Sequence, residues 1–359
     1  MKQLKVCILG QGRSGRDIHG IFFLRNPEMF KVAAVVEPLE ERRKRAEKEY
    51  GCDVYEDYRS ILGRRDLDLV LNATPSHLHV PITLELLKNG FNTLCDKPLA
   101  RSVQEVDMLI EASENSGKLF AIFQQSRYAP YFLQVRKVID SGILGRIVQI
   151  NIAFNGFSRR WDWQTLQEFN GGSLLNTGPH PLDQALQLFG TDVMPEITCI
   201  MDRANTFGDA EDHVKLILRG SGCPTVDVEI SSCCAYPCFT YNVYGTRGGL
   251  RGSMTHLDWK YFIQEEAPEQ KLIRTPLEKE DGTPAYCQEQ LKWYEESWDI
   301  PEEQKVLFDT LSKAYYTMLY KVITEGARLE VTPQQVRRQI AVIEECHRQN
   351  PLKKISIIH

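Results

Sequence analysis

Residues 5–15 read KVCILGQGRSG, an apolar run that ends in a glycine-rich turn. The turn, residues 10–15, has the form GxGxxG, and a helical pattern follows it. Glycines at these positions allow a tight turn, and the helix that follows points its N-terminus at a pyrophosphate. The stretch therefore predicts the strand, turn and helix that open a dinucleotide-binding Rossmann domain.

The next hundred residues continue this alternation of strand and helix. Apolar runs at 31–38, 67–75, 91–98 and 118–125 are separated by helical segments. Continuous apolar strands with helices between them form parallel sheets that are covered on both faces. We predict an α/β fold whose first domain, residues 1–123, is a doubly wound parallel sheet that binds NAD.

From residue 124 onward, strand-like runs follow one another with few helices between them. They are IVQINIAFN, EITCIMDRA, HVKLILRG, TVDVEISS and TYNVYGTRGGLRG. This pattern predicts an α+β domain over 124–359, built on a large, mostly antiparallel, open-faced sheet that binds substrate and pairs with other copies. The acidic segment from about 257 to 301 has no clear period and is interpreted as a surface excursion. A capping box from Thr332 to Gln335 predicts a terminal helix.

The composition narrows the class of protein. The chain has 359 residues, 42% of them hydrophobic and 25% charged, as in soluble globular proteins of two domains. The net charge of -5 gives no basic footprint for nucleic acid, and no apolar run is long enough for a membrane span. Ten cysteines without a CxxC pair favour free thiols in a reducing cytoplasm. We expect a cytoplasmic protein with neither nucleic acid nor membrane as partner.

The end of the second strand bears on the choice of cofactor. Glu37 lies 22 positions after Gly15, where a carboxylate accepts hydrogen bonds from the adenosine ribose and repels a 2′-phosphate. This favours NAD over NADP. The basic run at 42–45 is interpreted as a solvated helix face, and it keeps NADP open as the alternative.

The segment ATPSHLH, residues 73–79, follows a strand and so lies at the carboxyl edge of the sheet, where doubly wound folds bind ligands. His77 and His79 have no carboxylate or cysteine nearby, so a loop over the cofactor is favoured and no metal site is expected. The predicted cofactor contacts are Gly10, Gly12, Arg13, Ser14, Gly15, Glu37, Thr74, Pro75, His77, His79, Asp96 and Lys97.

Two further motifs carry candidate catalytic groups. CDKPLA, residues 95–100, brings Lys97 to the same sheet edge, and GGSLLNTGPHPLDQ, residues 171–184, places Asn176, His180 and Asp183 on one helix face. Prolines at 179 and 181 fit only a first helical turn, so the helix is predicted to start near Thr177. His180 then lies at the positive end of the helix, which lowers its pKa, and a nearby lysine ammonium acts in the same direction.

Taken in order, GQGRSG, Glu37, ATPSHLH, CDKPLA and GGSLLNTGPHPLD resemble the glucose-fructose oxidoreductase / inositol dehydrogenase (Gfo/Idh/MocA) family. The resemblance implies that His180 is the general base and that Lys97 reaches both nicotinamide and substrate, often with a cis bond to Pro98. Asp183 then orients the imidazole or binds a substrate hydroxyl.

The chain departs from the family pattern at two positions, with Asp96 in place of glutamate and Asn176 in place of aspartate. The change at Asp96 is one methylene and leaves the role of the lysine intact. An amide cannot relay a proton, so Asn176 either binds substrate or caps the helix.

Aromatic and hydrogen-bonding residues near these motifs suit a pyranose or an aglycone. The candidate substrate contacts are Arg127, Tyr128, Arg160, Trp161, Trp163, Asn176 and Tyr236, with Tyr241 as a further possibility.

The functional hypothesis is an NAD-dependent oxidoreductase that acts on a secondary hydroxyl of a sugar, glycoside or cyclitol. Within the family, the resemblance is to the branch that oxidises the C3 hydroxyl of glucosides. The alternatives are an NAD-dependent glycosidase or lyase that uses transient oxidation, and a non-catalytic NAD-binding regulator. The family resemblance also implies a homo-oligomer, a dimer or larger, paired through the open sheet face.

Overall fold

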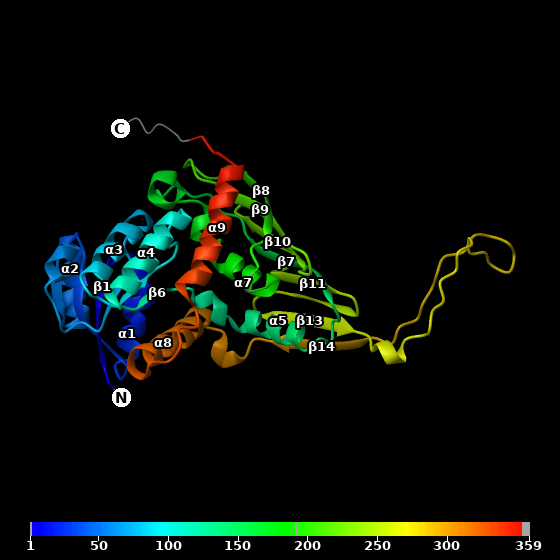
Figure 1. Ribbon diagram of the computed structural model, residues 1–359, viewed down its shortest axis with the longest axis horizontal. Helices are drawn as coiled ribbons and strands as arrows, with labels where there is room; N and C mark the ends of the chain where they lie inside the picture. The colour runs from blue at the N-terminus through cyan, green and yellow to red at the C-terminus, as the bar shows by residue number, and fades with distance from the viewer. Residues whose placement is uncertain (1, 191–192, 354–359) are drawn as a thin grey trace.

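The computed structural model describes residues 2–190 and 193–353 and contains two sheets joined by a continuous core (Figure 1). Its first sheet has six parallel strands in the order β3-β2-β1-β4-β5-β6. The strands are β1 Leu4–Leu9, β2 Phe30–Val36, β3 Asp53–Tyr55, β4 Leu69–Asn72, β5 Thr93–Cys95 and β6 Phe120–Ile122. The predicted doubly wound sheet is confirmed, with its strand order reversing between β1 and β4.

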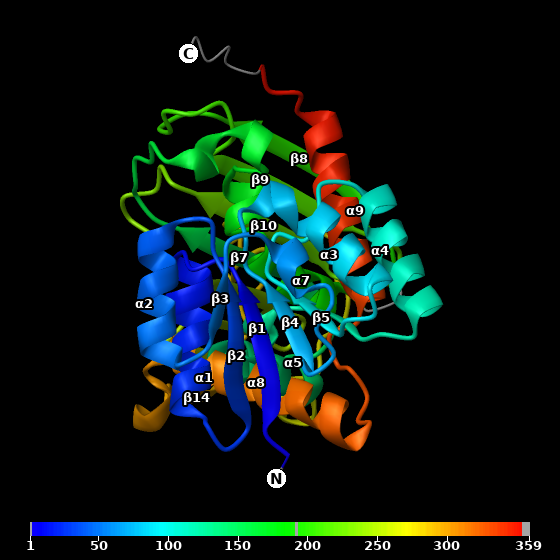
Figure 2. The same ribbon diagram turned by 90° about the vertical axis from the view of Figure 1, so that its left-hand side faces the viewer.

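Helices lie on both faces of this sheet (Figure 2). They are a π-helical turn Arg13–Gly20, α1 Ile21–Arg25, α2 Glu40–Tyr50, α3 His79–Lys88 and α4 Val103–Ser116. The residues that cap these helices are close in sequence to the helix ends. Ser102 and Glu105 form a capping box at the start of α4, and Gly117 takes the left-handed conformation after its last residue.

The second sheet has eight strands in the order β14-β13-β12-β11-β7-β10-β9-β8. The strands are β7 Ile147–Asn155, β8 Glu196–Asp202, β9 His213–Arg219, β10 Thr225–Ser231, β11 Tyr241–Gly245, β12 Gly248–Gly252, β13 His256–Tyr261 and β14 Tyr294–Asp299. Neighbours are antiparallel except for β7 and β10, so the predicted mostly antiparallel sheet is also confirmed.

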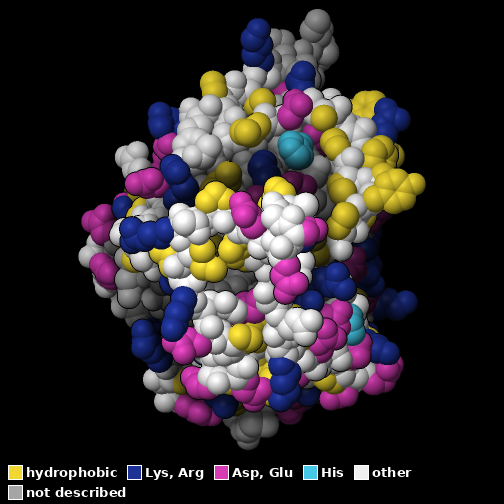
Figure 3. All heavy atoms as spheres, turned by 90° about the vertical axis from the view of Figure 1, so that its right-hand side faces the viewer, with side chains coloured by type: hydrophobic (Ala, Val, Ile, Leu, Met, Phe, Trp, Pro, Cys, Tyr) yellow, Lys and Arg dark blue, Asp and Glu magenta, His cyan; other side chains and the backbone are white. Residues whose placement is uncertain are grey.

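The helices of the second part of the chain are α5 Pro130–Asp140, α6 Ser173–Asn176, α7 Pro179–Phe189, α8 Leu307–Glu325 and α9 Pro333–Gln349. Of the described helices, α5, α7 and α9 lie on one side of the second sheet, and none packs on the other side (Figure 1). Viewed from that other side, hydrophobic and charged side chains are intermixed (Figure 3). None of the described helices is both long and apolar enough to cross a membrane.

The late helix α8 returns to the first sheet. Tyr320 donates a hydrogen bond to the carbonyl of Lys2 (2.8 Å), and Tyr315 donates one to the carbonyl of Ile122 (2.6 Å). The predicted terminal helix, α9, has the capping box of Thr332 and Gln335 and packs against α4 and β8. Helix α9 also contacts β6, so it connects the two sheets.

The interpretation of residues 257–301 as a surface excursion is correct for the middle of the segment and wrong for its ends. Strands β13 and β14 extend the second sheet, and only the chain between them, residues 262–293, leaves it as a long arm, drawn in yellow in Figure 1. Strand β14 is an outer strand with mostly exposed side chains, and it lacks the apolar alternation that marks a half-buried strand.

Candidate functional site

The glycine-rich turn is shaped for a phosphate group. Gly10 has φ of 92°, and a Cβ there would lie 2.6 Å from the carbonyl oxygen of Ala73. A Cβ on Gly15 would lie 1.9 Å from the carbonyl oxygen of Gly10, whereas one on Gly12 would meet no atom within 4 Å. Two glycines are therefore required by packing, and the third leaves open space before the helical turn that begins at Arg13. This space and the helix N-terminus fit the pyrophosphate of a dinucleotide.

Glu37 follows β2 and faces the same turn. Its carboxylate is buried and accepts hydrogen bonds from the backbone N–H groups of Gln11 (2.8 Å) and Leu39 (3.1 Å). A negative charge fixed beside the second residue of the glycine turn suits ribose hydroxyls and opposes an added phosphate.

The basic run after Glu37 is more than a solvated helix face, so that interpretation is partly wrong. Arg43 donates to the carbonyls of Glu37 and Pro38, and Arg45 donates to the carbonyl of Gln11. Arg45 thus stabilises the glycine-rich turn, and Arg43 stabilises the segment that follows β2. Arg42 and Lys44 fit the solvated-face interpretation better, since both are exposed: Lys44 pairs with Glu40 on the same helix, and Arg42 lies 3.7 Å from Glu37.

In the ATPSHLH segment, the hydroxyl of Thr74 donates to Asn72, Pro75 is exposed, and the edge of the His77 ring lies against Phe169. The ring nitrogens of His79 lie 2.7 Å from the Pro98 carbonyl and 2.8 Å from the Thr74 carbonyl.

His79 is buried, and burial lowers its pKa. It links two loops beneath the surface, and its contact with the cofactor stays a prediction. Among the described residues, no group of three or more His, Cys, Asp or Glu side chains is placed to hold a metal ion.

Asp96 also faces inward. One carboxylate oxygen accepts the backbone N–H of Lys97 (2.8 Å), and the other accepts the hydroxyl of Ser14. Burial alone would raise the pKa of Asp96, but His19, Lys97 and Ser14 together hold it well below its usual range. Asp96 thus forms an ionised link between the glycine turn and the Lys97 loop, and its contact with the cofactor stays a prediction.

Lys97 spans the boundary between the two sheets. Its Nζ atom donates to the carbonyl oxygen of Asn176, 2.8 Å away, and its peptide bond to Pro98 is cis. Burial lowers the pKa of Lys97, the charge of Asp96 opposes that shift, and the charges of Arg13 and Arg160 add to it. The lysine is thus a partly desolvated cation at the carboxyl edge of the first sheet.

His180 is the second residue of α7. Burial, and then the charge of Lys97, lowers the pKa of His180 to about 3 against an opposing effect of Asp96. Its Nδ1 atom is buried and makes no hydrogen bond. The imidazole is therefore neutral at physiological pH and has a nitrogen that can accept a proton.

The GGSLLNTGPHPLDQ stretch forms two helices, not one. Helix α6 ends at Asn176 and α7 begins at Pro179, with Gly178 between them. Gly178 packs so closely that a Cβ would lie 2.1 Å from the carbonyl of Leu174, and Pro179 has no N–H for a continuing helix. The prediction that Asn176 shares a helix face with His180 is wrong.

The capping role considered for Asn176 is also not observed. Gly178 is the N-cap of α7, with no side-chain hydrogen bond. The side-chain oxygen of Asn176 instead accepts a hydrogen bond from Gln164 (3.4 Å).

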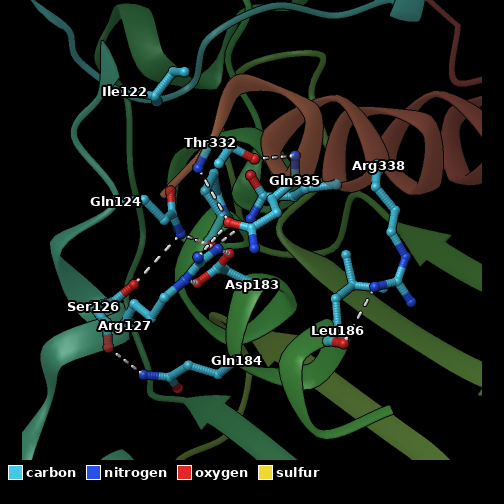
Figure 4. Close-up of polar contacts among 12 residues, drawn as sticks. Ile122, Gln124, Ser126, Arg127, Asp183, Gln184, Leu186, Thr332, Gln335 and Arg338 are labelled. Carbon is cyan, nitrogen blue, oxygen red and sulfur yellow. Dashed lines mark hydrogen bonds and ion pairs between the residues drawn. The ribbon is translucent and has the colours of Figure 1, made fainter. Parts of the chain in front are cut away.

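Arg127 and Asp183 form a buried ion pair (Figure 4). Two guanidinium nitrogens lie 3.0 and 2.5 Å from the two carboxylate oxygens, and the residues are 7% and 2% exposed. The guanidinium also donates to Gln335 (2.6 Å) and to the carbonyl of Glu330 (3.1 Å). Arg127 and Asp183 are thus committed to each other in this structure, and the substrate contact at Arg127 and the catalytic role of Asp183 stay predictions.

The other predicted substrate residues divide into two sets. Tyr128 donates to Glu330 (2.9 Å), and Tyr241 is buried and donates to Gln184, so Tyr241 belongs to the core. Trp161 is 78% exposed and Tyr236 is 89% exposed. These exposed aromatic residues lie on surface loops, and the described residues leave their faces largely uncovered.

The loop before α6 brings further side chains to the boundary. Arg160 pairs with Asp162 and contacts Gln164, which reaches Asn176. The rings of Trp163 and Phe169 meet edge to face, with centroids 6.4 Å apart, and Phe169 in turn contacts His77 of the first domain. This row of rings connects the loop before α6 to the first domain.

A cavity of about 470 Å³ lies next to the turn between α6 and α7 and includes Thr177 in its lining. Its other lining residues include Ser158, Ser231, Ser232, Thr240, Phe154 and Phe239, and no lining residue is charged. Hydroxyl groups and aromatic faces without charge suit a neutral, polyhydroxylated ligand.

Sequence reasoning missed Glu211, which positions α6. Its buried carboxylate accepts the N–H of Leu174 (2.9 Å) and lies against Gly172, where a Cβ would come within 2.3 Å of it. The doubled glycine before α6 was the available signal, because Gly172 has φ of 110° and leaves no room for a side chain.

Family models match most of the two domains. A model described as an oxidoreductase family with an NAD-binding Rossmann fold (GFO_IDH_MocA) matches residues 4–124. A model described as the GFO/IDH/MocA C-terminal domain matches residues 132–251.

Curated relatives share about a quarter of their residues with the chain. A 2,7-anhydro-N-acetylneuraminate hydratase of Mediterraneibacter gnavus is 26% identical over 77% of this chain and 76% of its own length. A scyllo-inositol 2-dehydrogenase (NADP(+)) of Bacillus subtilis is 26% identical over 60% of this chain and 59% of its own. A D-glucoside 3-dehydrogenase of Escherichia coli is 27% identical over 52% of this chain and 54% of its own.

Among solved structures, GenD2 from gentamicin A biosynthesis in complex with NAD superposes with a TM-score of 0.76. It is 18% identical, and the match covers 99% of this chain and 97% of that one, so the likeness is one of fold.

Proposed function

The chain belongs to the Gfo/Idh/MocA family of NAD-binding oxidoreductases, and from that premise we propose that it transfers a hydride between nicotinamide and a secondary carbinol carbon of a neutral sugar, glycoside or cyclitol. The observation that carries this proposal is the meeting of Lys97 and His180. One is a partly desolvated cation, the other is a neutral imidazole, and the charge of Lys97 lowers the pKa of His180.

The residues around the glycine turn fit the cofactor. The open space at Gly12 and the helical turn from Arg13 would hold the pyrophosphate, and Glu37 would hold the adenosine ribose. When bound, NAD supplies the hydride acceptor.

His180 is proposed as the general base. A neutral imidazole accepts the proton of the substrate hydroxyl as the carbinol carbon loses its hydride. Its low pKa keeps the imidazole in the base form, and burial at the start of α7 is the main cause of that shift.

Lys97 is proposed to stabilise the developing alkoxide. Its ammonium group is fixed by the carbonyl of Asn176 and lies in partly dry surroundings, where a positive charge interacts more strongly with an oxyanion than in water.

A neutral substrate is favoured by the cavity beside Thr177. Binding of a phosphate or carboxylate group favours cationic side chains, and the lining of this cavity has none. Phe154, Phe239 and the hydroxyl-rich wall of the cavity offer stacking and hydrogen bonds to a pyranose. The relative named D-glucoside 3-dehydrogenase makes the C3 hydroxyl of a glucoside our first choice of reacting group.

The position of Glu37 favours NAD over NADP as the cofactor. Its carboxylate is fixed by two backbone N–H groups, so it cannot turn away from an added 2′-phosphate without losing both bonds. Arg42, 3.7 Å from that carboxylate, is the residue that would favour NADP instead.

A second candidate function keeps the redox step but returns the hydride. This candidate is motivated by the relative named a hydratase, because hydration is not a net oxidation of the substrate. Lys97 and His180 would serve transient oxidation equally well.

The deciding experiment is a steady-state assay of NADH absorbance over a panel of neutral cyclitols, free sugars and methyl or phenyl glucosides, with products followed by chromatography. Net NADH formation supports the dehydrogenase. Cleavage or hydration without net NADH supports the second candidate. Absence of any turnover across the panel, with NADH bound, would favour a non-catalytic NAD-binding regulator.

A further inference from the structure

His19 is a buried ionisable side chain that the proposed reaction does not use. It lies in the π-helical turn that follows the glycine motif and is 0% exposed. Its Nδ1 atom is 2.5 Å from the hydroxyl oxygen of Tyr316 on α8. Its Nε2 atom makes no hydrogen bond and lies 3.7 Å from a carboxylate oxygen of Asp96.

The surroundings of the ring determine which nitrogen carries the proton. Burial raises the pKa of Tyr316 well above its ordinary value, so its hydroxyl keeps its proton and can donate it to Nδ1. When Nδ1 accepts that proton, a ring proton on Nε2 is directed at the ionised carboxylate of Asp96, 3.7 Å away. The opposite tautomer would turn a lone pair toward that carboxylate, which is unfavourable.

The ring is also held by packing. Phe123 meets it edge to face with centroids 4.4 Å apart, and Tyr316 itself stacks on Phe22 at 4.6 Å. His19 therefore cannot swing away from Asp96 without disturbing an aromatic cluster that joins α1, α8 and the end of β6.

Asp96 connects this ring to both halves of the site. One of its oxygens accepts the Ser14 hydroxyl within the cofactor turn, and the other accepts the backbone N–H of Lys97. A carboxylate that rotates would release both groups together. Whatever fixes Asp96 therefore fixes the cofactor turn and the lysine loop at once.

We propose that His19 is a positioning residue: the electrostatic attraction of its Nε2–H group, 3.7 Å from the Asp96 carboxylate, holds that carboxylate in place and thereby sets Ser14 for the cofactor and Lys97 for the substrate, while Tyr316 selects the tautomer. The part that concerns Lys97 rests on the proposed function. The part that concerns Ser14 rests only on the NAD-binding turn.

Two substitutions separate this role from simple packing. In His19→Gln the amide nitrogen can occupy the place of Nε2 and donate to Asp96, whereas in His19→Asn the amide takes the place of Nδ1 and cannot reach Asp96. Each variant keeps one contact of the ring and loses the other, so they serve as controls for one another.

The readouts are the Kd for NADH by fluorescence titration, kcat on whichever sugar the wild-type enzyme oxidises, and the Tm of the cofactor-free protein. We expect His19→Asn to raise the NADH Kd and to lower kcat, each by about tenfold or more, and His19→Gln to change each by less than about threefold, at similar Tm. Equal values for the two variants in both readouts, or losses that follow Tm, would overturn the proposal. A difference in only one readout would overturn the claim that a single contact serves both halves.

The two proposals fail in different ways. If wild-type protein oxidises no sugar but the NADH Kd still separates the variants, the proposed function fails and the role of His19 at the cofactor turn stands. If either His19 variant does not fold, Tyr316→Phe provides the second test, because it keeps the ring but frees its tautomer. It should raise the NADH Kd by about twofold to fivefold, and an unchanged Kd would contradict the proposal.

Discussion

Arg127 and Asp183 meet through two hydrogen bonds in a buried ion pair that joins the segment after β6 to helix α7. Removal of one partner leaves a buried charge without compensation. We expect Asp183→Asn to lower the free energy of unfolding by about 3–5 kcal/mol, measured by urea denaturation. The double variant Arg127→Met, Asp183→Leu should recover much of that loss. A change below about 1 kcal/mol in the single variant would mean that the pair is hydrated.

His180→Ala should lower turnover by orders of magnitude and leave the NADH Kd nearly unchanged, because His180 is proposed to accept the substrate proton and not to hold the cofactor. The measurement is kcat beside a fluorescence titration with NADH. Equal loss of NADH affinity would show that the general base lies elsewhere.

The pKa of His180, lowered from 6.5 to about 3, makes a prediction about pH. The imidazole stays neutral as pH falls from 8 to 5, so kcat/KM should show no loss of activity from this group near pH 6.5. Between pH 6.5 and 3 the unfolded chain binds a proton that the folded chain does not, so stability is full above 6.5 and decreases as pH falls. His180→Asn should reduce this pH dependence in urea titrations; an unaltered dependence would assign it to other groups.

Lys97 is expected to limit activity on the alkaline side. Its pKa is lowered from 10.5, mainly by burial, so the ammonium group is lost as pH rises through a value below 10.5. We expect kcat of the wild type to fall in that range, and Lys97→Met to be at least about a hundredfold slower with no such decline. A decline that persists in Lys97→Met would point to another residue.

Glu37→Ala should weaken discrimination against NADP, because the variant removes the charge that faces the 2′ position. The measurement is the ratio of the NADPH and NADH Kd values, and we expect a shift of at least about tenfold toward NADPH. Glu41→Ala, an exposed carboxylate on the same helix, is the matched control. If Glu37→Ala leaves the ratio unaltered, Arg42→Ala is the next variant to measure.

Much of the fold was predictable because its signals are local. The apolar runs, the glycine turn and the capping box of α9 each depend on neighbours within a few residues, and all three are found where the sequence placed them. Strand β14 escaped prediction because its side chains are mostly exposed, which removes the alternation that would have marked it.

The candidate site was less predictable because its partners are distant in sequence. Asp183 looked free for catalysis, yet its partner lies 56 residues earlier in the chain. No pattern within residues 171–184 indicates the pairing of Asp183 with Arg127. Similarly, the hydrogen-bond partner of His19 is Tyr316 on α8, 297 residues away in the sequence. Residue type and local spacing were enough to propose Lys97 and His180 as catalytic residues; the contacts that hold them could be found only in the tertiary structure.

The arm at 262–293 leaves and re-enters the sheet at one point, since Tyr261 and Tyr294 are directly paired across β13 and β14. The distance between its two ends is thus fixed by the strand pairing and does not depend on how many residues lie between them. The arm is therefore a suitable site for the insertion of another protein or a tag. We expect that a fluorescent protein or an affinity tag inserted there, or a short hairpin turn put in its place, would preserve the strand register and the positions of Lys97 and His180.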